Sequence, residues 1–526
     1  MWHSGAMSTN FAHVWSAQTA LLHARRISVE VDISRNTLQK FTIVGLPDKA
    51  VAESRDRVSA ALKNSGYTSP KSRNDKVVVS LAPADLKKEG PVFDLAIALA
   101  YLKAFGEIAF DSSGKLFLGE LSLLGEVRPL RGVVALVLEA KRLGFTEVFL
   151  PKENAEEAAL VPDITVYGVE TLREVILHVR EFSEDTLNGN TFSITPTSRT
   201  EIVYQKPFSA VSLEDIKGQQ SAKRGLVIAA AGGHNVILYG PPGTGKTMLA
   251  RALSSILPPL SFSESIEVTT IHSIAGILNQ PIITAPPFRA PHHTASHISL
   301  VGGGTIPKPG EVTLAHRGVL FADEFPEFDR RVIEALREPL EEHVVTISRA
   351  KGSATFPANF IFVAAMNPCP CGNFGSQKEC VCTPNVLTRY HERLSGPITD
   401  RIDLWIQVSH IPHDRLLLKV ESDETKHAEE CVLRARAIQR ERFKDPDCNA
   451  YTNAGMNARA LTRLITLDTS AKRTLLAAAR TFDLSPRSYH RLVKLARTIA
   501  DLDEADIVRE PHIMEALQYK IRLATK

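Results

Sequence analysis

The chain has 526 residues, of which 44% are hydrophobic and 23% are charged, and its formal net charge is +3. This length exceeds what one hydrophobic core supports and predicts about three domains. The near-neutral charge neither requires nor excludes nucleic acid, because a basic channel can lie within a balanced surface. The sequence contains no apolar run of membrane-spanning length and no secretory signal, and Met1 and Met7 are both suitable start residues. Six cysteines, four of them clustered, do not suit a secreted disulfide framework, so we expect a cytoplasmic protein without a membrane anchor.

Residues 8–182 alternate strand and helix patterns and are expected to form the first domain. Strict alternation predicts a strand over Ile27–Ile33, and a continuous apolar run predicts a buried strand over Lys76–Leu81. Helices are expected over Asp48–Asn64 and Val92–Phe105.

Three further regions follow along the chain. Residues 183–212 begin with a polar stretch rich in Ser, Thr and Asn and without periodicity, which is typical of a linker. Strand and helix patterns resume over residues 213–410, and only helical patterns remain over residues 411–526. The sequence therefore predicts a multidomain α/β protein with an all-helical C-terminal region.

A glycine-rich loop follows the apolar run Val236–Tyr239 and precedes a helix-forming segment. Its eight residues are Gly240, Pro241, Pro242, Gly243, Thr244, Gly245, Lys246 and Thr247. Glycines let the backbone turn so that several N–H groups point at phosphate oxygens, and the helix N-terminus adds partial positive charge. Lys246 would reach the β- and γ-phosphates and Thr247 would offer its hydroxyl to Mg²⁺. The loop predicts binding of a nucleoside triphosphate.

A buried strand over Gly318–Ala322 ends in two adjacent carboxylates, Asp323 and Glu324. Asp323 is expected to hold Mg²⁺ through its water shell, and Glu324 to orient and deprotonate the attacking water. A strand-end turn is the alternative explanation of such a pair. The position of the pair after the phosphate loop favours the catalytic role over the turn.

Three polar residues farther along complete the candidate ATPase site. Asn367 ends an apolar strand and is expected to help position the water, although a turn residue is the alternative. Arg401 is a candidate finger that reaches the γ-phosphate of a neighbouring subunit, and a surface ion pair with Asp400 or Asp403 is its alternative. Arg487 lies in the first turn of a helix opened by Ser485 and a proline, where it could touch the γ-phosphate of its own subunit or face solvent.

This ordered set resembles the core of an AAA+ ATPase with a helical lid. More closely, the chain resembles the ComM/YifB family of magnesium-chelatase-like ATPases over nearly its whole length. The segments that carry this resemblance are Asp215–Gln219, Ala229–Asn235, Phe288–Thr294, Leu300–Gly304, Pro309–Glu311, Met366–Gly372 and Ala496–Leu502. The resemblance implies a homohexameric ring that uses ATP and Mg²⁺ to act on single-stranded or branched DNA. A branch-migration helicase in recombination or natural transformation is the expected function; a chelatase-type or protein-remodelling ATPase is the alternative.

The first domain also resembles the Lon protease domain, an α+β fold, in the segments Lys88–Pro91, Leu123–Gly132 and Phe149–Asn154. That resemblance implies a serine nucleophile and a lysine base at positions where this chain has Val92 and about Val134. Valine offers neither a nucleophilic oxygen nor a titratable amine, so we expect no peptidase activity and a structural or assembly role.

Four cysteines lie between the polar strand end and the finger candidate, within residues 369–382. Cys369, Cys371, Cys380 and Cys382 form two C-x-C pairs with eight residues between them. Four thiolates on a short loop suit a closed structural Zn²⁺ site, with iron–sulfur ligation or free thiols as alternatives. Cys431 and Cys448 are expected to be unpaired.

DNA contacts are expected on a hairpin over Val344–Phe356, with Lys351 near its tip. By analogy with related motors, the hairpin would point into the ring pore, where Arg349 and Lys351 would contact phosphates. Ordinary solvated charges are the alternative. The histidines His292, His293 and His297 have no thiols near them in the sequence, which favours a loop or subunit-contact role over a second metal site.

Overall fold

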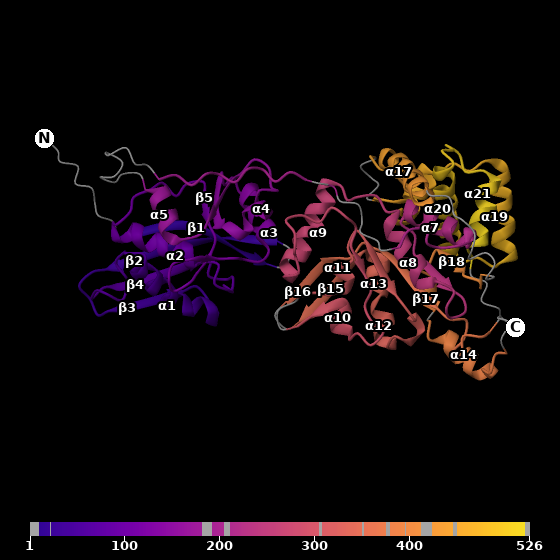
Figure 1. The fold of residues 1–526 in the computed structure, drawn as a ribbon, viewed down its shortest axis with the longest axis horizontal. Coiled ribbons are helices and arrows are strands. Elements are labelled where there is room, and N and C mark those ends of the chain that lie inside the picture. Colours follow the sequence, from indigo (N-terminus) through magenta and orange to yellow (C-terminus); the bar gives the residue numbers. More distant parts are fainter. Residues whose placement is uncertain are drawn as a thin grey trace. The chain divides into compact units, whose positions relative to one another are not determined.

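The computed structural model describes residues 10–20, 23–180, 192–202, 204, 211–304, 308–349, 352–374, 379–394, 396–411, 423–444 and 450–520 (Figure 1). The chain forms two compact units. Unit 1 comprises Met1–Ile202 and Thr269–Ile283, and unit 2 comprises Val203–Val268 and Thr284–Lys526. Within the described ranges, no helix has the length and apolar character needed to cross a bilayer.

Unit 1 contains the strands β1 (Phe11–Ala20), β2 (His23–Ser34), β3 (Lys40–Val44), β4 (Lys76–Ala82), β5 (Lys115–Phe117), β6 (Glu120–Leu121), β7 (Val127–Arg128), β8 (Glu147–Pro151) and β9 (Thr165–Val169). Its helices are α1 (Lys49–Asn64), α2 (Asp94–Phe105), α3 (Val133–Arg142), α4 (Ala155–Ala158) and α5 (Leu172–Val179). Seven strands form one mixed sheet in the order β3-β4-β2-β1-β5-β8-β9. Helices α2 and α3 contact β1 and β2 and bury their apolar faces in the core of this unit.

The strand and helix predictions for this region are confirmed. The predicted strands lie within β2 and β4, and the helix α1 begins after Asp48, whose carboxylate accepts a hydrogen bond from the Val51 N–H at 2.8 Å. The second predicted helix begins two residues later than expected. The carbonyl of Val92 accepts a hydrogen bond from the Gly119 N–H at 3.0 Å, so this residue belongs to the preceding turn.

The segment Thr269–Ile283, which includes the second half of α9 (Phe262–Ala275), is part of unit 1 although it lies inside the ATPase sequence. The buried Ser273 hydroxyl donates to the Glu157 carboxylate at 2.6 Å and accepts from the Gly132 N–H at 2.9 Å. These bonds fix the segment to the loop before α3 and to α4. No local sequence pattern encodes this contact, because its partners lie more than a hundred positions apart.

Unit 2 contains the strands β10 (Val236–Tyr239), β11 (Phe288–Arg289), β12 (Gly302–Gly303), β13 (Lys308–Pro309), β14 (Val319–Ala322), β15 (Val344–Arg349), β16 (Gly352–Pro357), β17 (Ile361–Met366) and β18 (Leu404–Gln407). The helices up to β18 are α7 (Gln220–Gly232), α8 (Lys246–Ser255), α10 (His297–Val301), α11 (Glu311–Leu314), α12 (Arg330–Ala335), α13 (Arg337–Glu342), α14 (Pro384–Glu392) and α15 (Gly396–Thr399). Five strands form a parallel sheet in the order β11-β14-β17-β10-β18. The predicted strands at the phosphate loop, the acidic pair and Asn367 are the central three.

The C-terminal helices are α17 (Glu424–Arg442), α18 (Ala458–Leu464), α19 (Thr469–Thr481), α20 (Pro486–Leu502) and α21 (Glu510–Gln518). Figure 1 shows them grouped at one end of unit 2, and α17 and α20 contact α7. One ring nitrogen of the buried His234 lies 3.1 Å from the Asp403 carboxylate and the other lies 2.8 Å from the Thr498 hydroxyl. This histidine therefore joins α20 to the segment that leads into β18.

A buried charge cluster holds α17 against α20. The carboxylate of Asp501 is fully buried and accepts hydrogen bonds from Arg442 at 2.9 Å, Arg497 at 2.8 Å and Asn453 at 2.7 Å. A buried charge is tolerated when partners surround it, and removal of one partner leaves the others unsatisfied. The stability of the helical region therefore depends on each residue of this cluster.

We predict that Asp501→Ala lowers the free energy of unfolding of unit 2 by about 3–5 kcal/mol, because the buried Arg497 and the largely buried Arg442 lose their shared carboxylate. Urea unfolding followed by the fluorescence of Trp405 measures this, with Trp2 and Trp15 replaced by Phe in both reference and variant.

The matched control is Glu504→Ala. The Glu504 carboxylate is 59% exposed and pairs with an exposed Arg434 at 2.9 Å. Its removal is expected to change the unfolding free energy by less than about 1 kcal/mol. Equal effects of the two substitutions would contradict the structural role given to the buried cluster.

Candidate active site

The phosphate loop connects β10 to α8 at the carboxyl edge of the parallel sheet. Its Gly240 N–H donates to the Met366 carbonyl of the neighbouring β17 at 3.2 Å. Gly243 and Gly245 have φ values of +76° and +87°, a conformation that residues with a side chain rarely adopt. Gly245 is the N-cap of α8, so the free N–H groups of that helix face the loop. The geometry is that of an anion-binding cradle.

Lys246 is the first residue of α8, and its ammonium group is turned into the loop. It donates to the carbonyl oxygens of Gly240 at 2.7 Å and Pro241 at 2.8 Å and lies 3.1 Å from the Asn367 Oδ1. Burial lowers the pKa of this ammonium, and the charges of Asp323 and Glu324 oppose that shift. Phosphate oxygens in the cradle would supply stronger acceptors than these carbonyls.

The acidic pair follows β14 directly. The Thr247 hydroxyl donates to the Asp323 carboxylate at 2.8 Å, so two oxygen groups suited to Mg²⁺ lie together beside the loop. Glu324 has a φ of +51°, and its side chain is half-exposed. The two adjacent carboxylates thus differ in their surroundings, because Asp323 is hydrogen-bonded to Thr247 whereas Glu324 is half-exposed.

His293 lies beside Glu324, with its Nδ1 3.5 Å from the carboxylate, and its ring lies against that of His292. The sequence reasoning assigned these histidines a loop or subunit-contact role and missed this proximity. The available signal was their place just after the Phe288–Arg289 segment. That segment forms β11, which pairs with β14, so its following residues reach the same edge of the sheet as Glu324.

Both candidate arginines contact one carboxylate. Arg401 and Arg487 each form an ion pair with Glu341 at the end of α13. Arg401 is only 8% exposed in its side chain and also donates to the Pro397 carbonyl, whereas Arg487 is 45% exposed. The predicted N-cap of α20 is confirmed, since the Ser485 hydroxyl accepts from the Ser488 N–H at 3.2 Å. Glu341 was not identified from the sequence.

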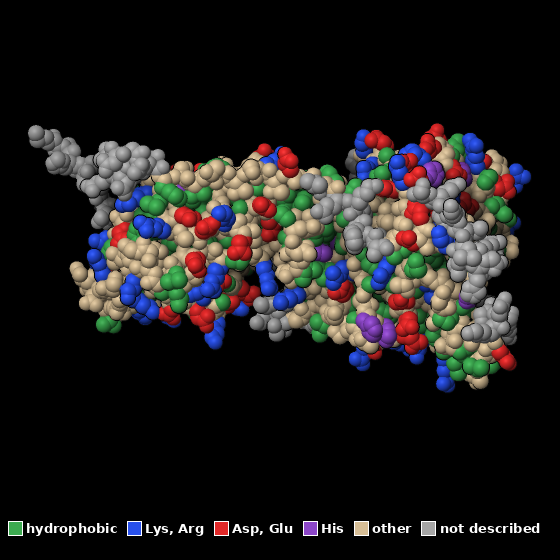
Figure 2. All heavy atoms as spheres, in the orientation of Figure 1, with side chains coloured by type: hydrophobic (Ala, Val, Ile, Leu, Met, Phe, Trp, Pro, Cys, Tyr) green, Lys and Arg blue, Asp and Glu red, His purple; other side chains and the backbone are tan. Residues whose placement is uncertain are grey.

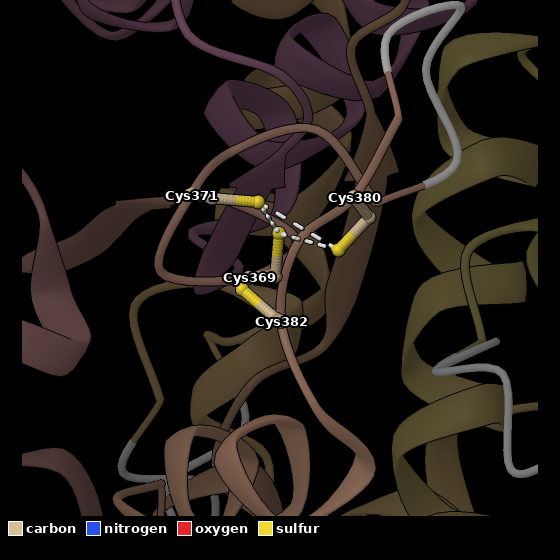
Figure 3. A group of neighbouring side chains, drawn as sticks. All are labelled: Cys369, Cys371, Cys380 and Cys382. Atoms are coloured by element: carbon tan, nitrogen blue, oxygen red, sulfur yellow. Dashed lines mark hydrogen bonds between the residues drawn. The ribbon is translucent and has the colours of Figure 1, made fainter.

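The four clustered cysteines lie on the loop after Asn367 (Figure 3). Their side chains point toward one another, and the four sulfur atoms lie within 4.8 Å of each other. The Sγ of Cys369 lies 3.3 Å from that of Cys371 and 3.7 Å from that of Cys380. Among the remaining cysteines, Cys431 is free on α17 and Cys448 lies outside the described residues.

The predicted hairpin forms as β15 and β16, paired from Val344↔Pro357 to Arg349↔Gly352. Lys351 and the side chain of Arg349 lie outside the described residues. On the described part of the face drawn in Figure 2, basic and acidic side chains are interspersed. That surface fits the near-neutral charge of the chain.

A cavity of about 670 Å³ lies at the opposite edge of the sheet, near the residues that precede β14 and β17. Two arginines of its lining already have partners: Arg317 pairs with Glu267 at 3.0 Å, and Arg436 donates to the Ala230 carbonyl at 2.8 Å. The phosphate loop and the acidic pair lie at the other edge of the sheet, so this cavity is not the candidate nucleotide site.

Three family models match the chain. "Magnesium chelatase, subunit ChlI" matches residues 212–416, "Subunit ChlI of Mg-chelatase" matches residues 29–154, and "Magnesium chelatase, subunit ChlI C-terminal" matches residues 422–520. Together they cover most of both units.

The chain is also similar to curated proteins over nearly its full length. It is 42% identical to "Competence protein ComM" of Haemophilus influenzae, covering 98% of this chain and 99% of that protein. It is 40% identical to "Uncharacterized protein YifB" of Salmonella typhimurium, covering 95% of each. With "Uncharacterized protein YifB" of Escherichia coli the identity is 39%, over 98% of this chain and 97% of the relative. The chain therefore belongs to the ComM/YifB family of magnesium-chelatase-like AAA+ ATPases.

Proposed function

We propose that this protein is an ATP-driven ring motor that acts on DNA and moves branched recombination intermediates. The observation that carries the ATPase part is the assembly of the phosphate loop, Asp323, Glu324 and Asn367 at one edge of a parallel sheet. The DNA part rests on full-length similarity to a relative whose title is a competence protein. A homohexameric ring in the cytoplasm is the form we propose for the active protein.

Each residue has a distinct role in the proposed reaction. Lys246 and the loop N–H groups bind the phosphates. Thr247 and Asp323 would hold Mg²⁺, which would supply positive charge to the transferred phosphoryl group. Glu324 accepts a proton from the attacking water, and Asn367 orients that water. Arg487 stabilises the γ-phosphate of its own subunit and Arg401 that of the neighbour.

Unit 1 is proposed to serve assembly rather than proteolysis, with a Lon-like fold. At the two positions where the Lon resemblance implies a nucleophile and a base, the chain has the buried residues Val92 and Val134. Neither side chain can form an acyl-enzyme.

Chelatase-type chemistry is the second candidate, because all three family models carry the magnesium chelatase description. Such a motor, or one that remodels proteins, would hydrolyse ATP without responding to DNA. The ATPase rate with and without DNA therefore separates the candidates.

We predict that single-stranded or four-way-junction DNA raises the ATPase rate, and that Arg349→Ala combined with Lys351→Ala removes this stimulation while basal hydrolysis remains. Phosphate contacts should also make the stimulation weaken as salt increases. The matched control is Arg473→Ala, an exposed arginine on α19 outside the hairpin. A rate that is indifferent to DNA in the wild-type protein would contradict the DNA assignment.

Substitutions of Lys246 and Glu324 should impair different steps of the ATPase reaction. Lys246→Ala is expected to abolish nucleotide binding because it removes phosphate-binding charge, whereas Glu324→Gln keeps binding and stops hydrolysis because the water base is lost. Fluorescent-nucleotide titration and phosphate release measure the two steps. Normal turnover by the Glu324→Gln protein would show that the roles are wrongly assigned.

Arg401→Ala is expected to leave ATP binding intact and to slow hydrolysis by about 10³–10⁵-fold at the neighbour's site. In rings mixed with Glu324→Gln subunits, interfaces that pair an intact Glu324 with a neighbour's intact Arg401 should recover activity above either variant alone. Activity recovers if each interface hydrolyses ATP independently of the others in the ring. Native mass spectrometry of the same mixtures checks that mixed rings have formed.

Glu341→Gln is the matched control for this arginine. It removes the carboxylate that pairs with Arg401 and Arg487 in the structure but leaves both guanidinium groups in place. If Arg401 is a finger, the Glu341→Gln ring remains active. If Arg401 only stabilises the fold through its ion pair, the two substitutions cause the same loss. An Arg401→Ala ring with unimpaired hydrolysis would exclude the finger.

A further inference from the structure

We propose that the four clustered cysteines hold one zinc ion, and that this ion keeps the phosphate loop in its nucleotide-binding shape. The zinc-dependent support of the phosphate loop rests on the nucleotide binding proposed above, whereas the metal site itself does not. We call the described residues 367–374 and 379–382 the cysteine loop.

The sulfur arrangement fits a tetrahedral thiolate site. With Zn–S bonds of about 2.3 Å, the edges of a regular tetrahedron of sulfurs are about 3.8 Å long. The measured separations of 3.3 Å, 3.6 Å and 3.7 Å among Cys369, Cys371 and Cys380 lie close to this value, and all four sulfurs lie within 4.8 Å of one another. A disulfide needs about 2.05 Å, far shorter than any of these. The cluster is shaped for a metal.

The backbone around the first pair supports such a site. The Phe374 N–H points at the Cys369 sulfur at 3.3 Å, and the Gly372 N–H donates to the Cys369 carbonyl at 3.0 Å. An N–H directed at a thiolate sulfur stabilises its negative charge and fixes the ligand's orientation. The turn thus directs the side chains of Cys369 and Cys371 toward the same point.

This turn packs directly on the phosphate loop. Gly372 has a φ of +79°, and a Cβ added to it would lie 2.6 Å from the Pro242 Cδ and 2.9 Å from its Cγ. Real Cβ atoms do not approach that closely, so only a glycine lets the cysteine loop touch the ring of Pro242. The position of this turn therefore limits where the middle of the phosphate loop can lie.

A second contact lies on the other side of the first cysteine pair. Asn367, two residues before Cys369, places its Oδ1 3.1 Å from the Lys246 ammonium and accepts at its carbonyl from the Tyr390 hydroxyl of α14 at 3.2 Å. The second cysteine pair leads into α14. A metal that joins the two pairs closes the loop and fixes both contacts.

Zinc binding and ATP binding are therefore coupled, and coupling between two sites is reciprocal. Loss of zinc releases the turn that supports Pro242 and the amide that faces Lys246, so nucleotide affinity falls. Bound nucleotide in turn slows the loss of zinc. Coupling between binding sites typically changes affinity about 5–150-fold, and we expect about tenfold here.

The first test is the metal content of full-length protein purified without added metal. We expect about one zinc per chain by elemental analysis. Cys380→Ser should lose the zinc, and Cys431→Ser is the matched control, because Cys431 is a free cysteine outside the cluster. Absence of zinc with all four thiols alkylated in the native state would overturn the site. Iron with visible absorption would overturn the choice of metal.

The second test measures coupling without relying on activity. Zinc release to the colorimetric chelator 4-(2-pyridylazo)resorcinol is followed in the Glu324→Gln background, with and without ATP. We expect ATP to slow the release about tenfold, and the further substitution Lys246→Ala to remove this protection. Cys380→Ser should also weaken binding of a fluorescent ATP analogue about tenfold, with circular dichroism showing that it remains folded.

The outcomes separate the two proposals. Zinc that is present but released at the same rate with and without ATP, in protein that binds the analogue, overturns the coupling alone. Zinc in a wild-type protein that binds no nucleotide overturns the proposed ATPase function and the coupling while the metal site stands.

Discussion

The parallel pairing of β10 between β17 and β18 is the constraint on which the proposed site depends. Tyr239 at the end of β10 lies opposite Met366 on one side and Gln407 on the other. Because the carboxyl ends of parallel strands meet at one edge, this register places the phosphate loop beside Asn367. The pairing of β14 with β17 then places Asp323 within reach of Thr247. A slip of one residue would separate these groups and reverse the faces of each strand.

Two residues just before β10 connect this sheet to the C-terminal helices. The Asn235 side chain accepts from the Phe362 N–H at 2.9 Å and donates to the Arg401 carbonyl at 3.0 Å. Its neighbour His234 lies between Asp403 and Thr498 of α20. A movement of α20 would therefore displace the strand that carries the phosphate loop and the segment that carries Arg401. Such a mechanical connection is what an ATP-driven motor requires.

Features encoded by neighbouring residues were predictable from the sequence. The phosphate loop, the acidic pair after a buried strand and the Ser485 cap each depend on residues within a few positions of one another, and the structure has them at the expected elements. The residues His234 and Asn235 were noticed only as part of a family resemblance. Their role in joining strands and helices became visible through contacts with residues far along the chain.

Contacts between distant residues were not predictable, because no local pattern encodes them. Glu341 is separated by 60 positions from Arg401 and by 146 from Arg487, yet it pairs with both. The approach of His293 to Glu324 and of Gly372 to Pro242 likewise depends on how the sheet brings separate loops together. These contacts determine how the expected chemical groups are restrained, which the types of residue alone do not reveal.

We propose that ATP hydrolysis at this edge of the sheet drives the movement of DNA junctions. The most direct measurement is ATP-dependent conversion of a synthetic four-way junction with homologous, movable arms into duplex products, followed by gel electrophoresis with labelled strands. We expect conversion by the wild-type ring and none by the Glu324→Gln ring, which binds ATP but lacks the water base. Steady ATP hydrolysis with the junction left intact, under conditions in which the protein binds it, would contradict the claim.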